Sequence, residues 1–153
     1  MRLVSGALAD LMNTYAPLAV PPECLRPAGA SLRGKILVVD DELAMRGFIG
    51  QALQNAGYED LLFCHTGTPV PFIARTERPS LIIMDVMMAG GNGMRALRNL
   101  KQSGLTRDIP VILTSGFNVL TLDESAENQP DHILPKPFTA PQLLQVVARL
   151  VEA

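Results

Sequence analysis

Four apolar runs of strand length constrain this chain more than any other feature of its sequence. They cover residues 35–39, 80–84, 111–114 and 132–135. Three of the runs are continuously apolar, which is typical of strands buried on both faces of a parallel sheet. Longer segments of mixed composition separate the runs, so a helix can cross back over the sheet after each strand. The pattern therefore predicts an α/β fold.

Helical periodicity fills most of the intervening segments. The predicted helices cover residues 42–56, 69–76, 93–103 and 139–151, with a shorter one within 118–130. The first of them ends at Gly57, a residue type that commonly terminates helices. A weaker strand is expected over Leu61–Cys64. Five strands alternating with five helices indicate a doubly wound, five-stranded parallel sheet with helices on both faces.

The first 33 residues differ in character from the rest of the chain. Apolar residues at spacings of four, three and four form one stripe of a short amphipathic helix, which consists of Val4, Leu8, Leu11 and Tyr15. Four prolines and two glycines between residues 17 and 34 then predict an extended linker. We expect an N-terminal extension over residues 1–33 and one domain over 34–153. Three alternatives are open for the stripe: it docks on that domain, it pairs two chains as a homodimer, or it is unstructured on its own.

Composition excludes several functional classes. The 13 basic and 15 acidic residues give a formal charge of -2, without the basic stripe that nucleic-acid binding requires. Cys24 and Cys64 lie in no CxxC or Cys/His cluster, so neither a disulfide framework nor a zinc site is expected. No apolar run reaches membrane-spanning length. We expect a cytoplasmic protein that contacts neither nucleic acid nor membrane.

Each strongly apolar strand ends on polar side chains. These are Asp40 and Asp41, Asp85, Thr114 and Ser115, and Lys136. Ligands of open parallel sheets bind at the carboxyl ends of the strands, so these groups can converge on one crevice. Neighbouring carboxylates repel unless a cation neutralises them, and an oxygen-only donor set favours a hard ion such as Mg²⁺. A carboxylate is also a competent nucleophile toward phosphorus, with an ammonium and a hydroxyl to hold the phosphoryl oxygens.

The order and spacing of these residues resemble the response-regulator receiver family, over about three quarters of the chain. The matching elements are ILVVDDE at 36–42, IIMDVMM at 82–88, PVILTSG at 110–116 and KPF at 136–138, with Gly93 eight residues after Asp85. The resemblance implies a flavodoxin-like strand order 2-1-3-4-5 and a receiver domain over residues 34–153.

The resemblance also implies roles for the site residues. Asp85 is the expected phosphoacceptor. The residues expected to hold Mg²⁺ are Asp40, Asp41, Asp85 and, through its main-chain carbonyl, Met87. Lys136 is expected to pair with the phosphoryl oxygens, and its peptide bond to Pro137 to be cis.

The switch hydroxyl of the family falls on Ser115. Alternation along the strand points only one of Thr114 and Ser115 into the site, and the family's spacing from Pro110 favours Ser115.

Three departures from the family pattern bear on signalling. Ala89 and Gly90 stand in a loop where the family commonly has a proline, and Ile133 replaces the usual aromatic switch residue. Met87 and Phe117 are large apolar residues at two positions that tune hydrolysis. Neither can orient an attacking water, so slow autodephosphorylation is expected.

The resemblance implies a two-component or phosphorelay signalling protein and not an enzyme with a separate substrate. The expected phosphodonor is a histidine kinase or a histidine phosphotransfer protein, and the expected output is a contact with a downstream protein target. No output domain is expected after the last helix. A stand-alone regulator and the C-terminal receiver of a hybrid histidine kinase fit equally well.

Two other functional classes are compatible with part of this pattern. A pseudo-receiver that binds a partner without phosphorylation draws mild support from the relaxed loop and the missing aromatic residue. An aspartate-nucleophile phosphatase is less favoured, because such enzymes need a D-x-D spacing whereas residues 40–42 read Asp-Asp-Glu.

Overall fold

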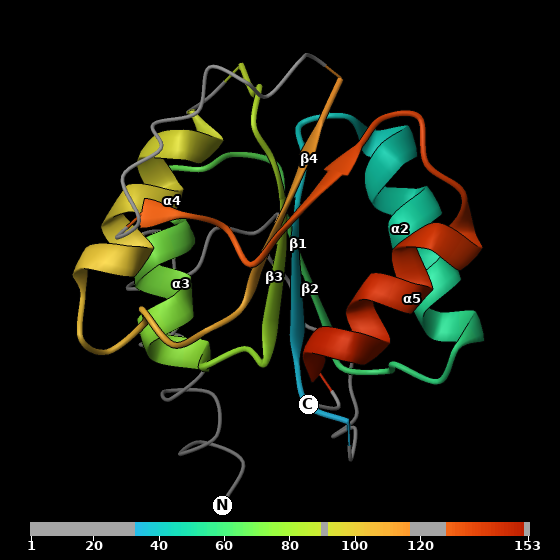
Figure 1. Ribbon diagram of the computed structural model, residues 1–153, viewed down its shortest axis with the longest axis horizontal. Helices are drawn as coiled ribbons and strands as arrows, with labels where there is room; N and C mark the ends of the chain where they lie inside the picture. Colours follow the sequence, from blue (N-terminus) through green and yellow to red (C-terminus); the bar gives the residue numbers. More distant parts are fainter. Residues whose placement is uncertain (1–32, 90–91, 117–127, 152–153) are drawn as a thin grey trace, which may run out of the picture.

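A computed structural model describes residues 33–89, 92–116 and 128–151 of the chain. In these residues strands and helices alternate along the sequence (Figure 1). The strands are β1 (Ile36–Val39), β2 (Leu61–Cys64), β3 (Leu81–Asp85), β4 (Val111–Ser115) and β5 (His132–Pro135). The helices are α2 (Leu43–Asn55), α3 (Val70–Glu77), α4 (Gly93–Gln102) and α5 (Ala140–Val151).

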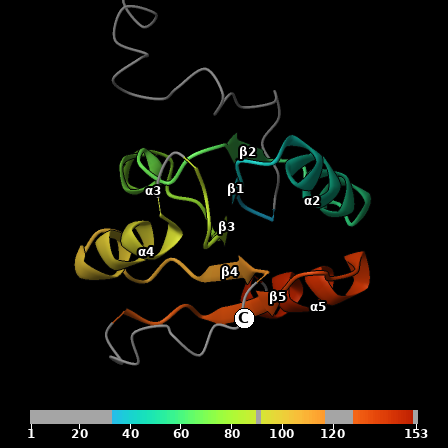
Figure 2. The same cartoon turned by 90° about the horizontal axis from the view of Figure 1, so that it is seen from above.

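The five strands form one parallel sheet in the order β2-β1-β3-β4-β5, which confirms the predicted doubly wound fold. Figure 2 shows α3 and α4 on one face of the sheet and α2 and α5 on the other. Each of these elements begins and ends within one residue of its predicted bounds. The helix predicted within 118–130 and the stripe predicted within 1–33 lie outside the described residues.

The core consists of two apolar layers, one on each side of the sheet. Side chains alternate along a strand, so Leu37 and Val39 of β1 pack under α3 and α4, whereas Ile36 and Val38 pack under α2 and α5. All four are at most 1% exposed. Burial on both faces explains why the strands read as continuous apolar runs in the sequence.

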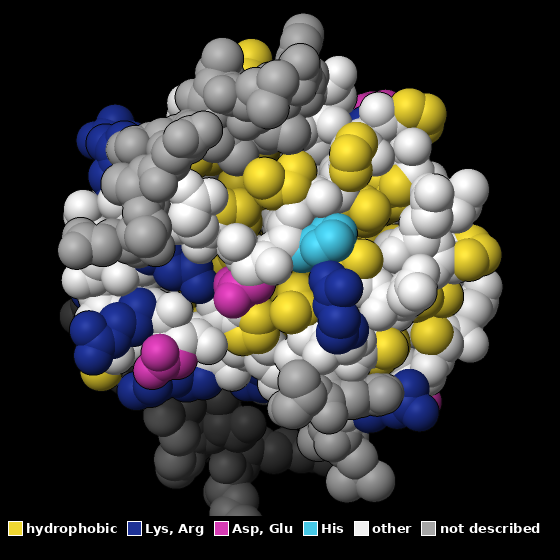
Figure 3. All heavy atoms as spheres, in the orientation of Figure 1, with side chains coloured by type: hydrophobic (Ala, Val, Ile, Leu, Met, Phe, Trp, Pro, Cys, Tyr) yellow, Lys and Arg dark blue, Asp and Glu magenta, His cyan; other side chains and the backbone are white. Residues whose placement is uncertain are grey.

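One flank of the sheet is only partly covered, at the β5 edge. Apolar side chains reach the surface there, between β5 and α5 (Figure 3), where a hollow of about 390 Å³ lies. At its margin, the Nη2 atom of Arg149 lies 2.9 Å from Nδ1 of His132. None of the helices in the described part of the chain is long and apolar enough to cross a membrane.

Candidate functional site

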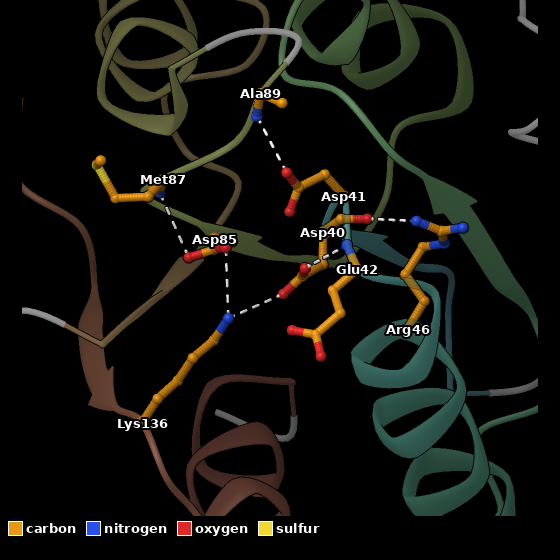
Figure 4. A network of polar contacts seen from close by, with 8 residues as sticks. All are labelled: Asp40, Asp41, Glu42, Arg46, Asp85, Met87, Ala89 and Lys136. Carbon is orange, nitrogen blue, oxygen red and sulfur yellow. Dashed lines mark hydrogen bonds and ion pairs between the residues drawn. The ribbon is translucent and has the colours of Figure 1, made fainter.

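The polar residues that follow β1, β3 and β5 converge at the carboxyl edge of the sheet (Figure 4). In the register of the sheet Val39 pairs with Met84, so Asp40 and Asp85 are neighbours. One carboxylate oxygen from each of Asp40, Asp41 and Asp85 lies within 4.8 Å of the others. The structure therefore brings together the three carboxylates that the sequence predicted.

Lys136 reaches this carboxylate cluster from the end of β5. Its Nζ atom lies 3.1 Å from Oδ2 of Asp40 and 3.3 Å from Oδ2 of Asp85, so the ammonium bridges the two buried carboxylates. Burial alone would lower the pKa of Lys136, but the hydrogen bond and charge of Asp40, with the charge of Asp85, raise it above its ordinary value. The lysine therefore stays positively charged at neutral pH. Its peptide bond to Pro137 is cis, as predicted.

Asp85 is only 6% exposed. Burial raises the pKa of its carboxyl group. The positive charge of Lys136 opposes this shift, the negative charge of Asp40 adds to it, and the net pKa lies above the ordinary value. The Oδ1 atom accepts a long hydrogen bond of 3.4 Å from the main-chain N–H of Met87. Asp85 is thus a poorly hydrated carboxylate beside a fixed cation.

The two other carboxylates have separate local partners. Oδ1 of Asp40 accepts a hydrogen bond of 2.9 Å from the N–H of Glu42, just before α2 begins. Asp41 is exposed, and its Oδ2 accepts a hydrogen bond of 3.0 Å from the N–H of Ala89, in the loop after β3. Asp41 therefore ties the loop after β1 to the loop that follows Asp85.

The two hydroxyl residues at the end of β4 lie differently. Thr114 is the Cα partner of Asp85 in the sheet, so both side chains share a face; the Thr114 hydroxyl is buried without a hydrogen-bond partner. Ser115 is also buried, and its carbonyl oxygen accepts a hydrogen bond of 2.7 Å from the N–H of Lys136. Ser115 therefore lies level with Lys136. Its role as the switch hydroxyl stays a prediction.

Gly93 places α4 directly against the end of β3, the strand that carries Asp85. Its N–H donates to the carbonyl oxygen of Val86 at 3.1 Å, and a Cβ atom at this position would overlap the main-chain oxygen of Asp85. Asn92 caps the helix by accepting a hydrogen bond of 2.7 Å from the N–H of Met94. Only glycine fits this approach, which explains the eight-residue spacing from Asp85.

Arg46 is a site residue that the sequence did not reveal. Its Nη1 atom donates a hydrogen bond of 2.6 Å to the main-chain oxygen of Asp40, from the first turn of α2 (Figure 4). The arginine holds the helix against the loop that carries the acidic residues. Its position six residues after Asp40 is the only sequence signal of this contact, and such a spacing is not specific.

These features define a doubly wound α/β domain with a carboxylate cluster and a lysine at the carboxyl edge of its sheet. A family model of the response regulator receiver domain matches residues 36–148. The chain belongs to this family, and its described residues form a receiver domain. The resemblance predicted from the sequence is thereby confirmed.

Individual relatives agree with this assignment. The phosphate regulon transcriptional regulatory protein PhoB of Pseudomonas aeruginosa is 39% identical over 116 residues, which are 75% of this chain and 49% of PhoB. The chain thus spans about half the length of that relative. A second relative is the DNA-binding transcriptional regulator NtrC of Bradyrhizobium, which is 35% identical over 117 residues. These residues are 76% of this chain and 24% of NtrC.

A solved structure, the receiver domain of a sensor histidine kinase from Pseudomonas aeruginosa with a magnesium ion in its active-site cleft, superposes with a TM-score of 0.70. It is 24% identical, with 81% of this chain and 100% of that one covered, and supports the fold alone.

Proposed function

We propose that Asp85 accepts a phosphoryl group from the phosphohistidine of a histidine kinase or a histidine phosphotransfer protein. The observation that carries the proposal is the position of Lys136, whose ammonium contacts both Asp85 and Asp40 at the open edge of the sheet. In the transfer, the P–N bond of the donor breaks and its electron pair returns to the imidazole ring. The new O–P bond forms from a lone pair of the Asp85 carboxylate.

The residues around Asp85 suit this step. Lys136 offers a fixed positive charge where the oxygens of the phosphoryl group carry negative charge in the transition state. Poor hydration leaves the Asp85 carboxylate little water to shed before it attacks. Asp40 remains bound to Lys136 and to the N–H of Glu42, so it balances the lysine while Asp85 reacts.

We propose Mg²⁺ as the resident metal ion, held by Asp40, Asp41, Asp85 and the carbonyl group of Met87. The donor set consists of oxygen alone, and Asp41 is exposed to solvent, which suits an ion that keeps several of its waters. When bound, the ion neutralises the carboxylates and the phosphoryl oxygens. The receiver domain of the Pseudomonas aeruginosa sensor histidine kinase, which has the same fold, has a magnesium ion in its own active-site cleft.

Acetyl phosphate with Mg²⁺ tests the proposal on the full chain. Intact mass should show the gain of one phosphoryl group, and the gain should disappear in Asp85→Asn and in the presence of a chelator. Asp108→Asn, which changes an exposed carboxylate outside the site, should behave as wild type. No gain in the wild type, and no spectral change with beryllofluoride, would instead favour the pseudo-receiver. The complete carboxylate and lysine cluster argues against that outcome.

A pair of variants tests the assignment of the switch hydroxyl. Ser115→Ala should leave phosphorylation of Asp85 possible but abolish the beryllofluoride-induced spectral change near β4. Thr114→Val removes a buried hydroxyl that has no hydrogen-bond partner and should retain the change. The reverse pattern would transfer the role to Thr114, which shares the sheet face of Asp85.

The slow autodephosphorylation predicted from the sequence rests in part on Met87. Its side chain is 58% exposed and points away from Asp85 (Figure 4), so it does not shield the carboxylate in this conformation. The thioether of Met87 nevertheless cannot orient an attacking water. Met87→Asn should shorten the lifetime of the phosphorylated protein, and Met87→Leu should leave it unchanged. Equal lifetimes in both variants would remove Met87 from the argument. Phe117 lies outside the described residues.

A further inference from the structure

A groove of about 390 Å³ runs along the outer flank of α2, beside the edge strand β2. It is lined by Leu43, Arg46, Gly47, Gly50, Gln51, Gln54 and Phe63. The other flank of α2 packs on the α5 side of the layer, where the rings of Phe48 and Phe138 lie 6.0 Å apart. Among the described elements, α2 alone covers this face of the sheet at its β2 end (Figure 2). Within the described part of the chain, the groove is therefore the open margin of a two-helix layer.

The groove exposes apolar surface and has room for an incoming side chain. Leu43 is 75% exposed at one end, and Phe63 is half-buried in the floor. The Phe63 ring fills the space beside Gly50, where a Cβ atom would lie 2.8 Å from Cζ. No heavy atom lies within 4 Å of a Cβ atom built on Gly47. A side chain from another segment can thus enter at Gly47.

The chain enters the domain close to this groove. The guanidinium group of Arg33 donates a hydrogen bond of 3.0 Å to the carbonyl oxygen of Ala56 and lies 5.3 Å from the ring centroid of Tyr58. Both contacts are at the C-terminal end of α2, where Gln54 lines the groove. The side chain of Arg33, the first described residue, thus reaches the end of α2 along which the groove runs.

The linker is long enough for residues 1–16 to reach any point of the groove. Residues 17–32 span about 50 Å if they adopt the extended polyproline conformation that their prolines favour. Helix α2, with 13 residues, is only about 20 Å long. Even a much more compact linker would suffice.

Residues 1–16 offer an apolar stripe that can cover the two apolar side chains of the groove, Leu43 and Phe63. Their predicted helix presents the apolar stripe of Val4, Leu8, Leu11 and Tyr15, and it carries only two charged side chains, Arg2 and Asp10. A helix this short is marginal in water unless its apolar face is packed. The covalent connection to the domain gives residues 1–16 a high effective concentration at the groove, which favours the groove of the same chain over that of a second copy.

We propose that residues 1–16 form a helix that packs its apolar stripe into the α2 groove of the same chain. This contact does not depend on phosphorylation. Hydrogen exchange of the full chain, read by mass spectrometry, tests it: peptides from residues 1–16 and from α2 should both be protected. Leu8→Asp should speed exchange of both by roughly tenfold or more, since it places a charge in the stripe.

Matched variants keep the test specific. Asn13→Asp adds the same charge on the opposite side of the predicted helix and should preserve protection. Gly47→Phe places a ring in the groove from the α2 side, where a Cβ atom meets nothing within 4 Å, and should release residues 1–16 as Leu8→Asp does. Peptides covering β1 and β3 report whether each variant remains folded.

Three results would overturn the proposal. The first is rapid exchange of residues 1–16 in the wild type. The second is protection that Leu8→Asp abolishes but Gly47→Phe leaves intact, which would place the helix elsewhere. The third is a hydrodynamic mass that doubles with concentration and returns to that of a monomer in Leu8→Asp, which would make the occupant a second copy.

Discussion

Asp85 combines two opposing effects that decide how it behaves at neutral pH. Burial and the neighbouring Asp40 raise the pKa of its carboxyl group, whereas Lys136 lowers it; the net direction is upward from the ordinary value of 3.8. The folded protein therefore binds this proton more tightly than the unfolded chain does. The free energy of unfolding should therefore fall as the pH rises from about 3.8 to the raised pKa of Asp85. At higher pH it should stay at this lower value.

Replacing Asp85 should therefore stabilise the protein at neutral pH. In the presence of a chelator, Asp85→Asn should raise the free energy of unfolding by about 1 kcal/mol. The substitution removes a poorly hydrated charge, and Lys136 retains its ion pair with Asp40. The gain should vanish below the ordinary pKa of 3.8, where both chains carry a neutral group. Urea unfolding at several pH values measures it, with the exposed Asp108→Asn as control. A gain that persists at low pH would refute the electrostatic cause.

Gly93 shows how the backbone of one residue positions the site. Gly93→Ala should cost about 1–3 kcal/mol and slow phosphorylation of Asp85, because the added methyl group overlaps the main-chain oxygen of Asp85 and must displace β3 or α4. Gly47→Ala is the matched control, since its Cβ atom meets nothing within 4 Å; it should stabilise α2 by about 0.5–1 kcal/mol. Equal effects of the two variants would contradict the role of close packing at Gly93.

Sequence reasoning found the side chains of the site but not all of its contacts. Asp40, Asp85 and Lys136 could be predicted because each follows an apolar strand, and parallel strands end at one edge. The hydrogen bond of Arg46 and the overlap that requires Gly93 depend on how a helix approaches a loop. Such distances are set by tertiary packing and leave no periodic signal.

At the scale of the elements, α4 is joined to the start of β4 and β5 by one polar network. Asp131, just before β5, accepts hydrogen bonds from the N–H of Val111 at 2.8 Å and from Nζ of Lys101 at 3.0 Å. The same ammonium donates to the carbonyl oxygens of Arg107 and Ile109. The network lies at the opposite edge of the sheet from the carboxylate cluster and fixes where β5 begins.

Breaking this network should cost stability without disturbing the chemistry of Asp85. Asp131→Ala leaves the buried N–H of Val111 without its acceptor, so we expect a loss of about 1–3 kcal/mol in the free energy of unfolding. The control is Asp108→Ala, which removes an exposed carboxylate between Arg107 and Ile109. It should change stability by less than about 0.5 kcal/mol. Chemical denaturation measures both. An Asp131→Ala loss no larger than that of the control would show that water replaces the carboxylate.

The elements themselves were predictable because the strands are continuous apolar runs and the helices have apolar faces. The end of α3 was predicted within one residue, but the conformation that terminates the helix was not. It is capped by Arg78 in a left-handed conformation (φ 51°), a position that glycine or asparagine usually occupies. The guanidinium group of Arg78 lies 3.5 Å from the carbonyl oxygen of Leu105, which is distant in the sequence. This tertiary contact accompanies a left-handed conformation that the intrinsic backbone preference of arginine disfavours. Propensity alone cannot foresee such a contact.

At the scale of the whole molecule, the carboxylate cluster and the α2 groove share a border. Leu43 lines the groove, follows Asp41 by two residues and is 75% exposed. Met87, two residues after Asp85, is 58% exposed. A protein phosphodonor must place its histidine against Asp85 and therefore cover this rim. A small donor such as acetyl phosphate need not. A helix docked in the groove would thus obstruct one kind of donor only.

The two kinds of donor should respond differently when the N-terminal helix is released. In the full chain, Leu8→Asp should speed phosphoryl transfer from a phosphorylated histidine phosphotransfer protein by up to about tenfold, if the docked state holds about nine tenths of the molecules. The rate with acetyl phosphate should be unchanged, because Asp85 and Lys136 are not altered. Asn13→Asp should match the wild type with both donors. Equal acceleration with both donors would mean that the N-terminal segment acts on the carboxylate cluster itself and not on access to its rim.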